Sequence, residues 1–201
     1  MTDKPRIILA SGSQGRQAML RNAGLPFHTI PANIDEDAII ARLTAGNRDI
    51  KFITAQLATD KALHISAANA DTLVIGSDQT LESEGALLSK AVNTADAEAK
   101  LKSLRGKTHI LHSAVSLVRD GEVIFSYTDH ASLTMHDFDD DFLENYMKKA
   151  PDALTSCVGG YKIEGAGAWL FSSVTGDLFT IMGMPLLPLL SYLRTECEFS
   201  L

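Results

Sequence analysis

The chain has 201 residues, 45% of them hydrophobic and 21% charged, and a formal net charge of −7. This length favours a single domain with a sizeable core, and an acidic chain without a basic stripe argues against nucleic-acid binding. The two cysteines, Cys157 and Cys197, are too few for a disulfide framework, and no Cys/His cluster has the spacing of a zinc site. The apolar run near the start is too short for a signal sequence, and no window is long enough to span a membrane. We therefore expect a cytoplasmic protein without a membrane partner.

Hydrophobic periodicity predicts strands and helices in alternation along the chain. Short apolar runs predict strands at 6–10, 27–30, 72–77 and 168–174. Helical spacing and capping residues predict helices from Gln14 to before Gly24, around 35–37, and at 49–69, 96–104, 139–149 and 185–195. The Asp-Gly pair at 120–121, between apolar runs at 109–118 and 122–127, predicts a β-hairpin. This order of elements predicts an α/β fold with a mixed sheet.

The turn after the first strand carries the first candidate site. Ser11, Ser13 and Arg16 lie between the end of a predicted strand and the start of a helix. Free backbone N–H groups at a helix N-terminus, two hydroxyls and a guanidinium together suit a phosphate group. The alternative is ordinary capping, with Ser13 as the N-cap and Arg16 in solvent.

Three charged side chains are further candidates. Asp78 follows the apolar run 72–77, where it is predicted to begin a polar turn. A carboxylate at such a strand end either binds Mg²⁺, orients a water molecule or caps the turn. Lys61 lies on a partly apolar helix and Lys90 follows a short apolar run. Each lysine is either a partner for polyphosphate or a surface residue with an apolar stem.

A glycine-rich segment at 159–167 is the last candidate. Its glycines permit close approach of the backbone to a ligand, and Lys162 and Glu164 would share a face if the segment were a strand. The alternative is a glycine-rich turn without a ligand.

Short segments spread over nearly the whole chain resemble, in order, the motifs of one family. It is the Maf family of nucleoside triphosphate pyrophosphatases, first described as septum formation inhibitors. The matching segments are LASGSQGR at 9–16, DE at 35–36, LATDKA at 57–62, GSD at 76–78, KA at 90–91, GGYKIEG at 159–165 and GMPL at 183–186.

The resemblance implies a Maf/ITPase-like fold: an elongated mixed β-sheet flanked by helices, in one domain over 1–201, with two lobes around a cleft. It implies hydrolysis of the α–β phosphate bond of a nucleoside triphosphate, yielding the monophosphate and pyrophosphate, by a protein that is often a homodimer. In that assignment Asp78 is the general base, with Lys61 and Lys90 as catalytic cations. Substrate-binding positions match Ser11, Ser13, Arg16 and Glu36. Because a triphosphate carries about four negative charges, a divalent cation, Mg²⁺ or Mn²⁺, is also expected. Glu36 and Asp78 either hold this cation or align water for in-line attack, and the sequence leaves both roles open.

Several positions depart from the family motifs. The family's Pro-Arg-Arg is Gln14-Gly15-Arg16 here, so one arginine is missing, and Ala91 replaces a proline. Subfamilies differ at the positions of Gly15, Gln79 and Glu164. Gln79 and Glu164 resemble the branch that acts on 7-methyl-GTP, whereas Gly15 fits neither branch. Because Glu164 can accept hydrogen bonds from the N1–H and N2–H₂ edge of guanine, we expect a purine substrate.

Two other classes of function stay open on the sequence. The missing arginine leaves room for a nucleotide-binding regulator of septum formation without catalysis. An unrelated α/β hydrolase is disfavoured, because the motifs occur in the order of the Maf family.

Overall fold

The computed structural model describes residues 6–197 and 199. These residues form a seven-stranded sheet in the order β2-β1-β3-β5-β6-β7, with β4 also paired to β3. β1 runs parallel to β2 and β3, whereas β4 is antiparallel to β3 and β7 to β6, so the predicted mixed sheet is confirmed. The strands are β1 (Arg6–Leu9), β2 (His28–Thr29), β3 (Thr72–Ser83), β4 (Ala86–Leu88), β5 (Thr108–Arg119), β6 (Glu122–Met135) and β7 (Phe171–Thr175).

Helices lie between and after these strands, and most begin where a polar side chain caps the first turn. Five N-cap side chains accept a hydrogen bond from a backbone N–H in the first turn of the helix that follows. They are Ser13, Asp35, Asp49, Asn93 and Asp139. The helices are α1 (Gln14–Asn22), α2 (Glu36–Ala45), α3 (Ile50–Ser66), α4 (Thr94–Leu104), α5 (Asp140–Lys149), α6 (Pro151–Ser156), α7 (Leu178–Met182), α8 (Leu186–Glu196) and the 3₁₀ helix η1 (Ala166–Leu170).

The chain divides into two compact units. The first contains the chain up to Gln79, residues 113–129 and the chain from Gly183 onward, and the second contains 80–112 and 130–182. The cleft expected between two lobes stays a prediction. No helix among residues 6–197 is long and apolar enough to cross a membrane.

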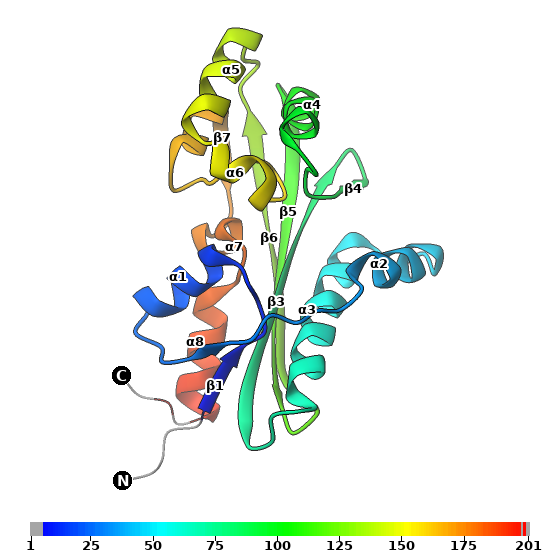
Figure 1. Ribbon diagram of the computed structural model, residues 1–201, viewed down its shortest axis with the longest axis vertical. Coiled ribbons are helices and arrows are strands. Elements are labelled where there is room, and N and C mark those ends of the chain that lie inside the picture. The colour runs from blue at the N-terminus through cyan, green and yellow to red at the C-terminus, as the bar shows by residue number, and fades with distance from the viewer. Residues whose placement is uncertain (1–5, 198, 200–201) are drawn as a thin grey trace. The chain divides into compact units, whose positions relative to one another are not determined.

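In the first unit, α3 lies on one side of β3 and α8 on the other (Figure 1). Buried apolar side chains from β1, β3, β5 and α3 fill the space on the α3 side. They are Ile8, Ala10, Ala62, Ile65, Val74 and Val118. Close approach of α3 to β3 depends on Gly76, because a Cβ there would collide with the Ala58 carbonyl oxygen and lie 2.8 Å from the Ala62 Cβ. This contact sets how far the side chains of α3 reach past the strand.

The close contact at Gly76 predicts a large loss of stability in Gly76→Ala. The added methyl would meet backbone rather than a movable side chain, so the helix or the strand must shift, at a cost of about 3 kcal/mol in the free energy of unfolding. Urea denaturation measures this loss. Gly46→Ala is the control, because its Cβ would meet its nearest atom at 3.4 Å; equal midpoints for the two variants would contradict the prediction.

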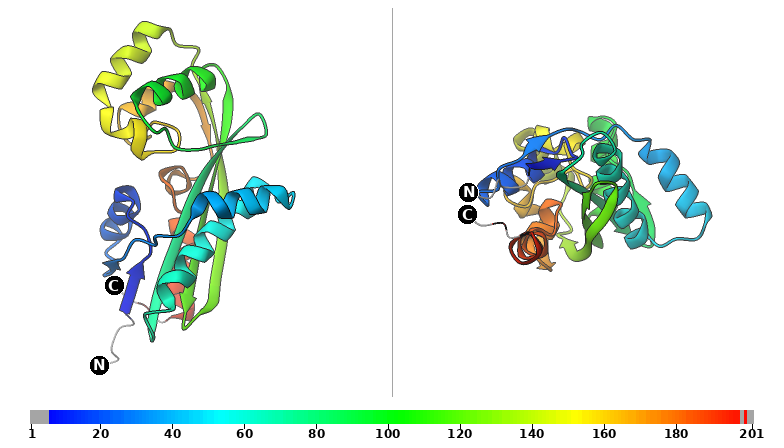
Figure 2. Two further views of the ribbon diagram at one scale, coloured as in Figure 1. Left: turned by 45° about the vertical axis from the view of Figure 1, so that its right-hand side comes forward. Right: turned by 90° about the horizontal axis from the view of Figure 1, so that it is seen from below.

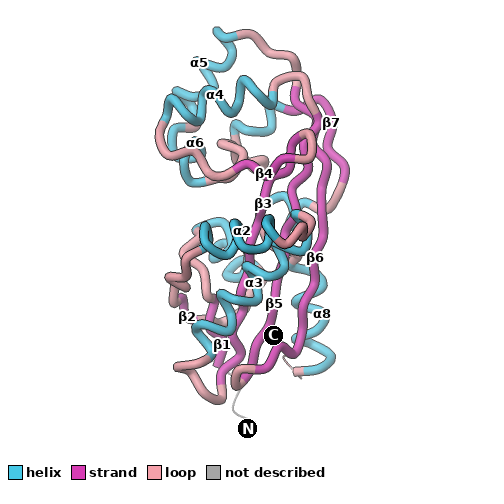
Figure 3. Tube along the Cα trace, turned by 90° about the vertical axis from the view of Figure 1, so that its right-hand side faces the viewer, coloured by secondary structure: helices cyan, strands magenta, loops and turns pink. Residues whose placement is uncertain are grey.

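The second unit has its own core. Figures 2 and 3 show α4, α5 and α6 gathered on one side of the strands of this unit. Within that core the Tyr161 hydroxyl and His109 Nε2 are 2.6 Å apart, and burial lowers the pKa of His109 to about 4. His109 is therefore neutral at physiological pH, and its role is packing and hydrogen bonding.

Three predicted elements differ from the observed ones. The strand expected at 72–77 continues to Ser83, so Asp78 lies within β3 and not in a turn. The polar residues do not break the strand, because other elements supply their partners: Lys61 bonds Asp78, and Ser113 bonds Gln79. The strand expected from 168 begins only at Phe171, after η1. The segment at 159–165 is made of turns, so Lys162 and Glu164 do not share the face of a strand.

The predicted hairpin is confirmed, although its strands are longer than expected. Asp120 and Gly121 have φ values of 51° and 80° and join β5 to β6. Positive φ at both central residues is the geometry of the tight hairpin turn that Asp-Gly favours.

Candidate functional site

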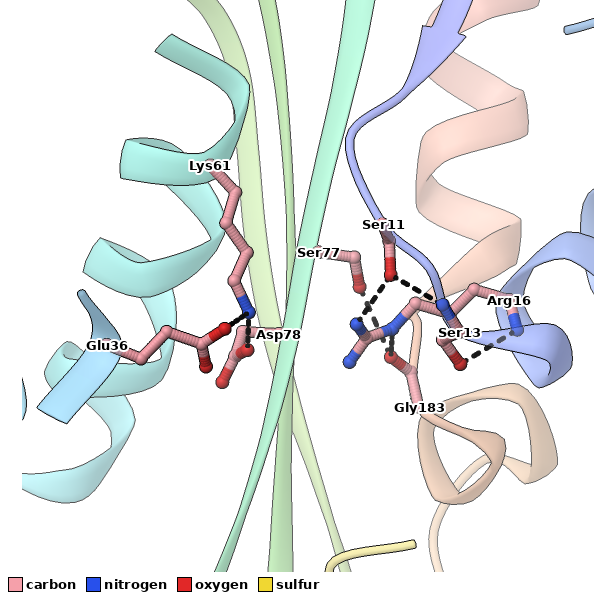
Figure 4. Close-up of polar contacts among 8 residues, drawn as sticks. All are labelled: Ser11, Ser13, Arg16, Glu36, Lys61, Ser77, Asp78 and Gly183. Carbon is pink, nitrogen blue, oxygen red and sulfur yellow. Dashed lines mark hydrogen bonds and ion pairs between the residues drawn. The ribbon is translucent and has the colours of Figure 1, made fainter. Parts of the chain in front are cut away.

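The turn between β1 and α1 forms a compact set of hydrogen-bond donors (Figure 4). The Ser13 Oγ caps α1 by accepting from the Arg16 backbone N–H at 3.5 Å. The Ser11 Oγ accepts from the Ser13 backbone N–H and from Arg16 Nη1, each at 3.2 Å. Because the Ser11 oxygen accepts two bonds, its own proton is left to be donated to a ligand. Capping and the predicted donor cluster therefore occur together in this turn.

Arg16 is held from two directions. Its Nε donates to the Gly183 carbonyl oxygen at 2.9 Å, and its Nη1 donates to the Ser11 Oγ. Both acceptors are uncharged, so the positive charge of the guanidinium is not neutralised by them. An anion is the ligand that this arrangement favours.

Carboxylates from two elements converge on the ammonium group of Lys61. Lys61 Nζ lies 2.9 Å from Glu36 Oε1 and 2.5 Å from Asp78 Oδ1 (Figure 4). α3 provides the lysine, the first residue of α2 provides Glu36, and β3 provides Asp78. Lys61 and Asp78 are buried, whereas the Glu36 side chain is 46% exposed. The alternative of a surface role for Lys61 is therefore excluded.

Burial and charge act against each other at Asp78 and Arg16. Burial raises the pKa of the Asp78 carboxyl, and the positive charges of Lys61 and Arg16 oppose this rise. Burial lowers the pKa of the Arg16 guanidinium, and the negative charges of Asp78 and Glu36 oppose that change. The four groups are thus within electrostatic reach of one another. Their two positive and two negative charges balance, so binding a polyanion requires further positive charge.

The site has two clusters: the turn cluster of Ser11, Ser13 and Arg16, and the ion-pair cluster of Glu36, Lys61 and Asp78. Neighbouring residues of β3 contact one cluster each. Ser77 donates from Oγ to the Gly183 carbonyl at 3.2 Å, on the side of Arg16, whereas Asp78 meets Lys61 on the side of α3 (Figure 4). Successive side chains of a strand point to opposite faces, which explains the division. Gln79 donates from Nε2 to the Ser113 Oγ at 3.0 Å. A Cβ on Gly183 would lie 3.7 Å from Gln79 Oε1, so Gln79 lies on the Gly183 side.

The two carboxylates fit a divalent cation that is completed by its substrate. Glu36 and Asp78 already approach one cationic atom, and Mg²⁺ typically takes one or two carboxylates together with phosphate oxygens. Within residues 6–197 and 199, no group of three or more His, Cys, Asp or Glu side chains is arranged to hold a metal ion by itself. That Glu36 and Asp78 would hold the ion stays a prediction.

The structure brings together most of the predicted site residues, but not all of them. Ser11, Ser13, Arg16, Glu36, Lys61 and Asp78 all belong to the first unit and form the two clusters. Gly15 is the second residue of α1. Lys90 and Glu164 belong to the second unit, and their part in the site stays a prediction.

Two residues that contact Arg16 or its acceptor have no role in the sequence interpretation. In the sequence, Ser77 ends an apolar run, so nothing marks it as a site residue. In the structure its side chain is fully buried. Gly183 lies in the closing motif at 183–186, which carries no charged side chain. Only the glycine of that motif, a residue that tolerates unusual backbone angles, hints at a constrained backbone.

Comparison with known proteins agrees with the motifs. The family model "Maf-like protein" matches residues 6–196. A nucleoside triphosphate pyrophosphatase of Nitrobacter winogradskyi is 47% identical over 195 residues, or 97% of this chain and 96% of that protein. A 7-methyl-GTP pyrophosphatase of Rhizobium etli is 43% identical over 190 residues, or 94% of this chain and 96% of that protein. Among solved structures, a HAM1 protein from Coxiella burnetii aligns with a TM-score of 0.43 and 15% identity over 66% of this chain and 74% of that chain.

The sequence matches include every element that forms the two clusters. The range of the family model contains the turn with Ser11 and Arg16, the carboxylates, Lys61 and the loop at Gly183. The relatives cover both units of the chain. This chain belongs to the Maf-like protein family.

Proposed function

We propose that this protein hydrolyses the α–β phosphate bond of a nucleoside triphosphate and releases a monophosphate and pyrophosphate. The convergence of Lys61, Glu36 and Asp78 near Arg16, whose two hydrogen-bond acceptors are uncharged, is the observation that supports this activity most directly. The relatives named for nucleoside triphosphate or 7-methyl-GTP pyrophosphatase activity support the same reaction.

The donor cluster of the β1–α1 turn binds the phosphates. The free N–H groups of Arg16, the Ser11 hydroxyl proton and the first turn of α1 all donate to phosphate oxygens. A triphosphate carries about four negative charges, which Arg16 and Lys61 alone do not neutralise. Lys90 supplies a further positive charge.

Asp78 acts as the general base. Its carboxylate accepts a proton from a water molecule that attacks phosphorus in line with the bridging oxygen. Lys61 opposes the rise in the pKa of Asp78 that burial causes, and it fixes one of the carboxylate oxygens, Oδ1, at 2.5 Å. Glu36 binds the same ammonium and keeps its position constant.

A divalent cation fits beside these residues. Glu36 and Asp78 would hold it, and when bound it would neutralise phosphate charge. The balance of charges among the four groups of the first unit supports the proposal of such an ion.

The substrate preference is proposed from individual residues. Glu164 can accept from the N1–H and N2–H₂ groups of guanine, which uracil and thymine do not offer. Gln79 and Glu164 also resemble the branch that acts on 7-methyl-GTP, and a relative with that name shares 43% of the aligned residues. We therefore propose a purine nucleotide, with 7-methyl-GTP as the first candidate.

Pyrophosphate release from a nucleotide panel tests the proposed function. The panel contains 7-methyl-GTP, GTP, UTP, dTTP and CTP, each with Mg²⁺ or Mn²⁺. Hydrolysis of 7-methyl-GTP or GTP well above the pyrimidine nucleotides supports both the activity and the preference. Faster turnover of UTP or dTTP overturns the preference alone, and release from none of them overturns the activity.

Gly15→Arg restores the arginine that the family motif carries before Arg16. The change places a second basic side chain in the phosphate-binding turn, beside Arg16, so we expect KM for the triphosphate to fall about tenfold. It also replaces glycine within α1, which stabilises the helix by about 1 kcal/mol.

Gly15→Ala separates the two effects. It gives the gain in helix stability without the charge, so thermal denaturation should show the gain in both variants while KM falls only with arginine. An unchanged KM in Gly15→Arg would show that position 15 does not reach the phosphates.

A further inference from the structure

The carbonyl oxygen of Gly183 receives hydrogen bonds from two different elements. Arg16 Nε of α1 donates to it at 2.9 Å, and Ser77 Oγ of β3 donates to it at 3.2 Å (Figure 4). Both lone-pair directions of this carbonyl are therefore used. The Ser77 hydroxyl is fully buried, so water does not replace this bond when it is lost.

The surrounding loop keeps this carbonyl in place. Gly183 has a φ of 113°, a conformation that side-chain-bearing residues rarely adopt. Met184 is completely buried and Leu186 is 3% exposed, so the residues after the carbonyl are anchored in the core. α8 starts immediately afterwards, with Pro185 at its N-cap. The direction of the carbonyl is thus set by the backbone and by Ser77, independently of Arg16.

The fixed Gly183 carbonyl binds one N–H group of the Arg16 guanidinium and so determines which N–H groups remain for a ligand. A guanidinium has five N–H groups in one plane. Arg16 uses Nε–H for Gly183 and one Nη1–H for Ser11. No other acceptor among the described residues bonds it, so three N–H groups in a defined plane remain for an anion. Arginine gives directional recognition of phosphate only when this plane is fixed.

We infer that Ser77 and Gly183 are positioning residues for Arg16. Ser77 orients the Gly183 carbonyl, and the carbonyl fixes the plane in which Arg16 meets a phosphate group. The identity of the anion as a nucleotide phosphate rests on the proposed function, whereas the positioning of Arg16 does not.

Ser77→Ala tests whether the contacts from Ser77 to Gly183 and from Gly183 to Arg16 position the guanidinium. The measurement is the binding of Mg²⁺-pyrophosphate by calorimetry. We expect about tenfold weaker binding, because a buried hydrogen bond that orients the acceptor is lost. In an Arg16→Lys background, which has no Nε to meet the carbonyl, Ser77→Ala should change binding by less than about twofold. A tenfold loss in both backgrounds would overturn the inference, because Ser77 would then act without Arg16.

Ser66→Ala is the matched control for the loss of a buried serine hydroxyl. Ser66 is 3% exposed and accepts from the Gly121 backbone N–H at 3.1 Å, in a bond that involves no site residue. It should lower the melting temperature to a similar extent as Ser77→Ala and leave pyrophosphate binding unchanged. Equal weakening of binding by both variants would mean that Ser77 is merely structural.

Solvent exchange of the Arg16 Nε–H, followed by nuclear magnetic resonance, separates this inference from the proposed function. The exchange needs no nucleotide and should be several-fold faster in Ser77→Ala than in the unmodified protein, because the acceptor loses the hydrogen bond that orients it together with the backbone. Unchanged exchange overturns the positioning role, even if nucleotides are hydrolysed. Faster exchange in a protein that neither hydrolyses nucleotides nor binds pyrophosphate would support the positioning role and contradict the proposed function.

Discussion

Asp78→Asn is expected to lower pyrophosphate release by about 10³-fold while the fold is kept. The amide fills the same space but does not accept a proton from water, and general base catalysis contributes about 10²–10⁴-fold. Lys61 still has Glu36 as a charged partner at 2.9 Å, so the buried ammonium is not left alone. Release of pyrophosphate from the best nucleotide of the panel, together with binding of that nucleotide, measures the effect.

Asp49→Asn is the control for this substitution. Asp49 caps α3 by accepting from the Phe52 backbone N–H at 2.7 Å, and asparagine caps helices equally well. The control should keep full activity. If Asp78→Asn kept more than about a tenth of the activity, Asp78 would not be the base, and another group would have to accept the proton.

The same variant discriminates between enzyme and regulator. A protein that arrests septation only by binding nucleotide would keep that effect in Asp78→Asn, because the phosphate-binding turn is unchanged. A septation effect that disappears together with turnover would instead require catalysis. The comparison needs the binding measurement, since a variant that does not bind nucleotide tests neither function.

Local signals predicted most of the first unit correctly. The start of α1 at Gln14 was predicted next to Ser13, whose side chain caps the helix. Helical spacing of apolar residues predicted the start of α3 at Asp49, one residue before the observed start. The Asp-Gly pair at 120–121 gave the hairpin, because both positions take positive φ. These features depend only on neighbouring residues.

The course of β3 was not predictable from neighbouring residues. Asp78 and Gln79 are typical of a turn, yet Lys61 and Ser113 accommodate them within the strand. Those partners lie 17 and 34 residues away in the sequence, and no local pattern shows that they meet. The same reason explains why the contact of Ser77 with Gly183 has no signal in the sequence.

Position along the chain made Ser11, Arg16, Asp78 and Lys61 candidates, and the family motifs joined them into one predicted site. Spacing alone left Lys61 as a surface residue or a phosphate ligand, and only the fold shows it buried between two carboxylates. Gly76 illustrates the physical reason: the absence of its side chain lets α3 approach β3, and Lys61 of α3 meets Asp78 of the same strand. Gly76 itself lies in the GSD motif at 76–78, but the sequence does not show which helix approaches it.

Lys61→Met should reduce kcat/KM at neutral pH by about 10²-fold and move the acid limb of the pH profile to higher pH. The loss at neutral pH follows from removing a buried cation next to the reacting phosphate. Methionine has a similar length and suits a buried position, so the fold should be kept. Profiles of kcat/KM against pH for both proteins measure the change.

The direction of the pH shift follows from the charges around Asp78. The base works only when ionised, so activity falls as pH drops through the pKa of Asp78. Burial already raises that pKa, and Lys61 is the largest influence that lowers it. The negative charge of Glu36 also raises the pKa of Asp78, and without Lys61 less positive charge opposes it. Asp78 in Lys61→Met should therefore become protonated at a higher pH. Part of the lost activity should therefore return as the pH is raised.

Lys51→Met is the matched control, since Lys51 lies on the same helix and is exposed. It removes one positive charge from the protein without touching Asp78, so its pH profile should equal that of the unmodified enzyme. An acid limb that stays in place in Lys61→Met would mean that Asp78 does not set it. In that case the ion pair at 2.5 Å would serve to position Asp78, and a different group would govern the loss of activity in acid.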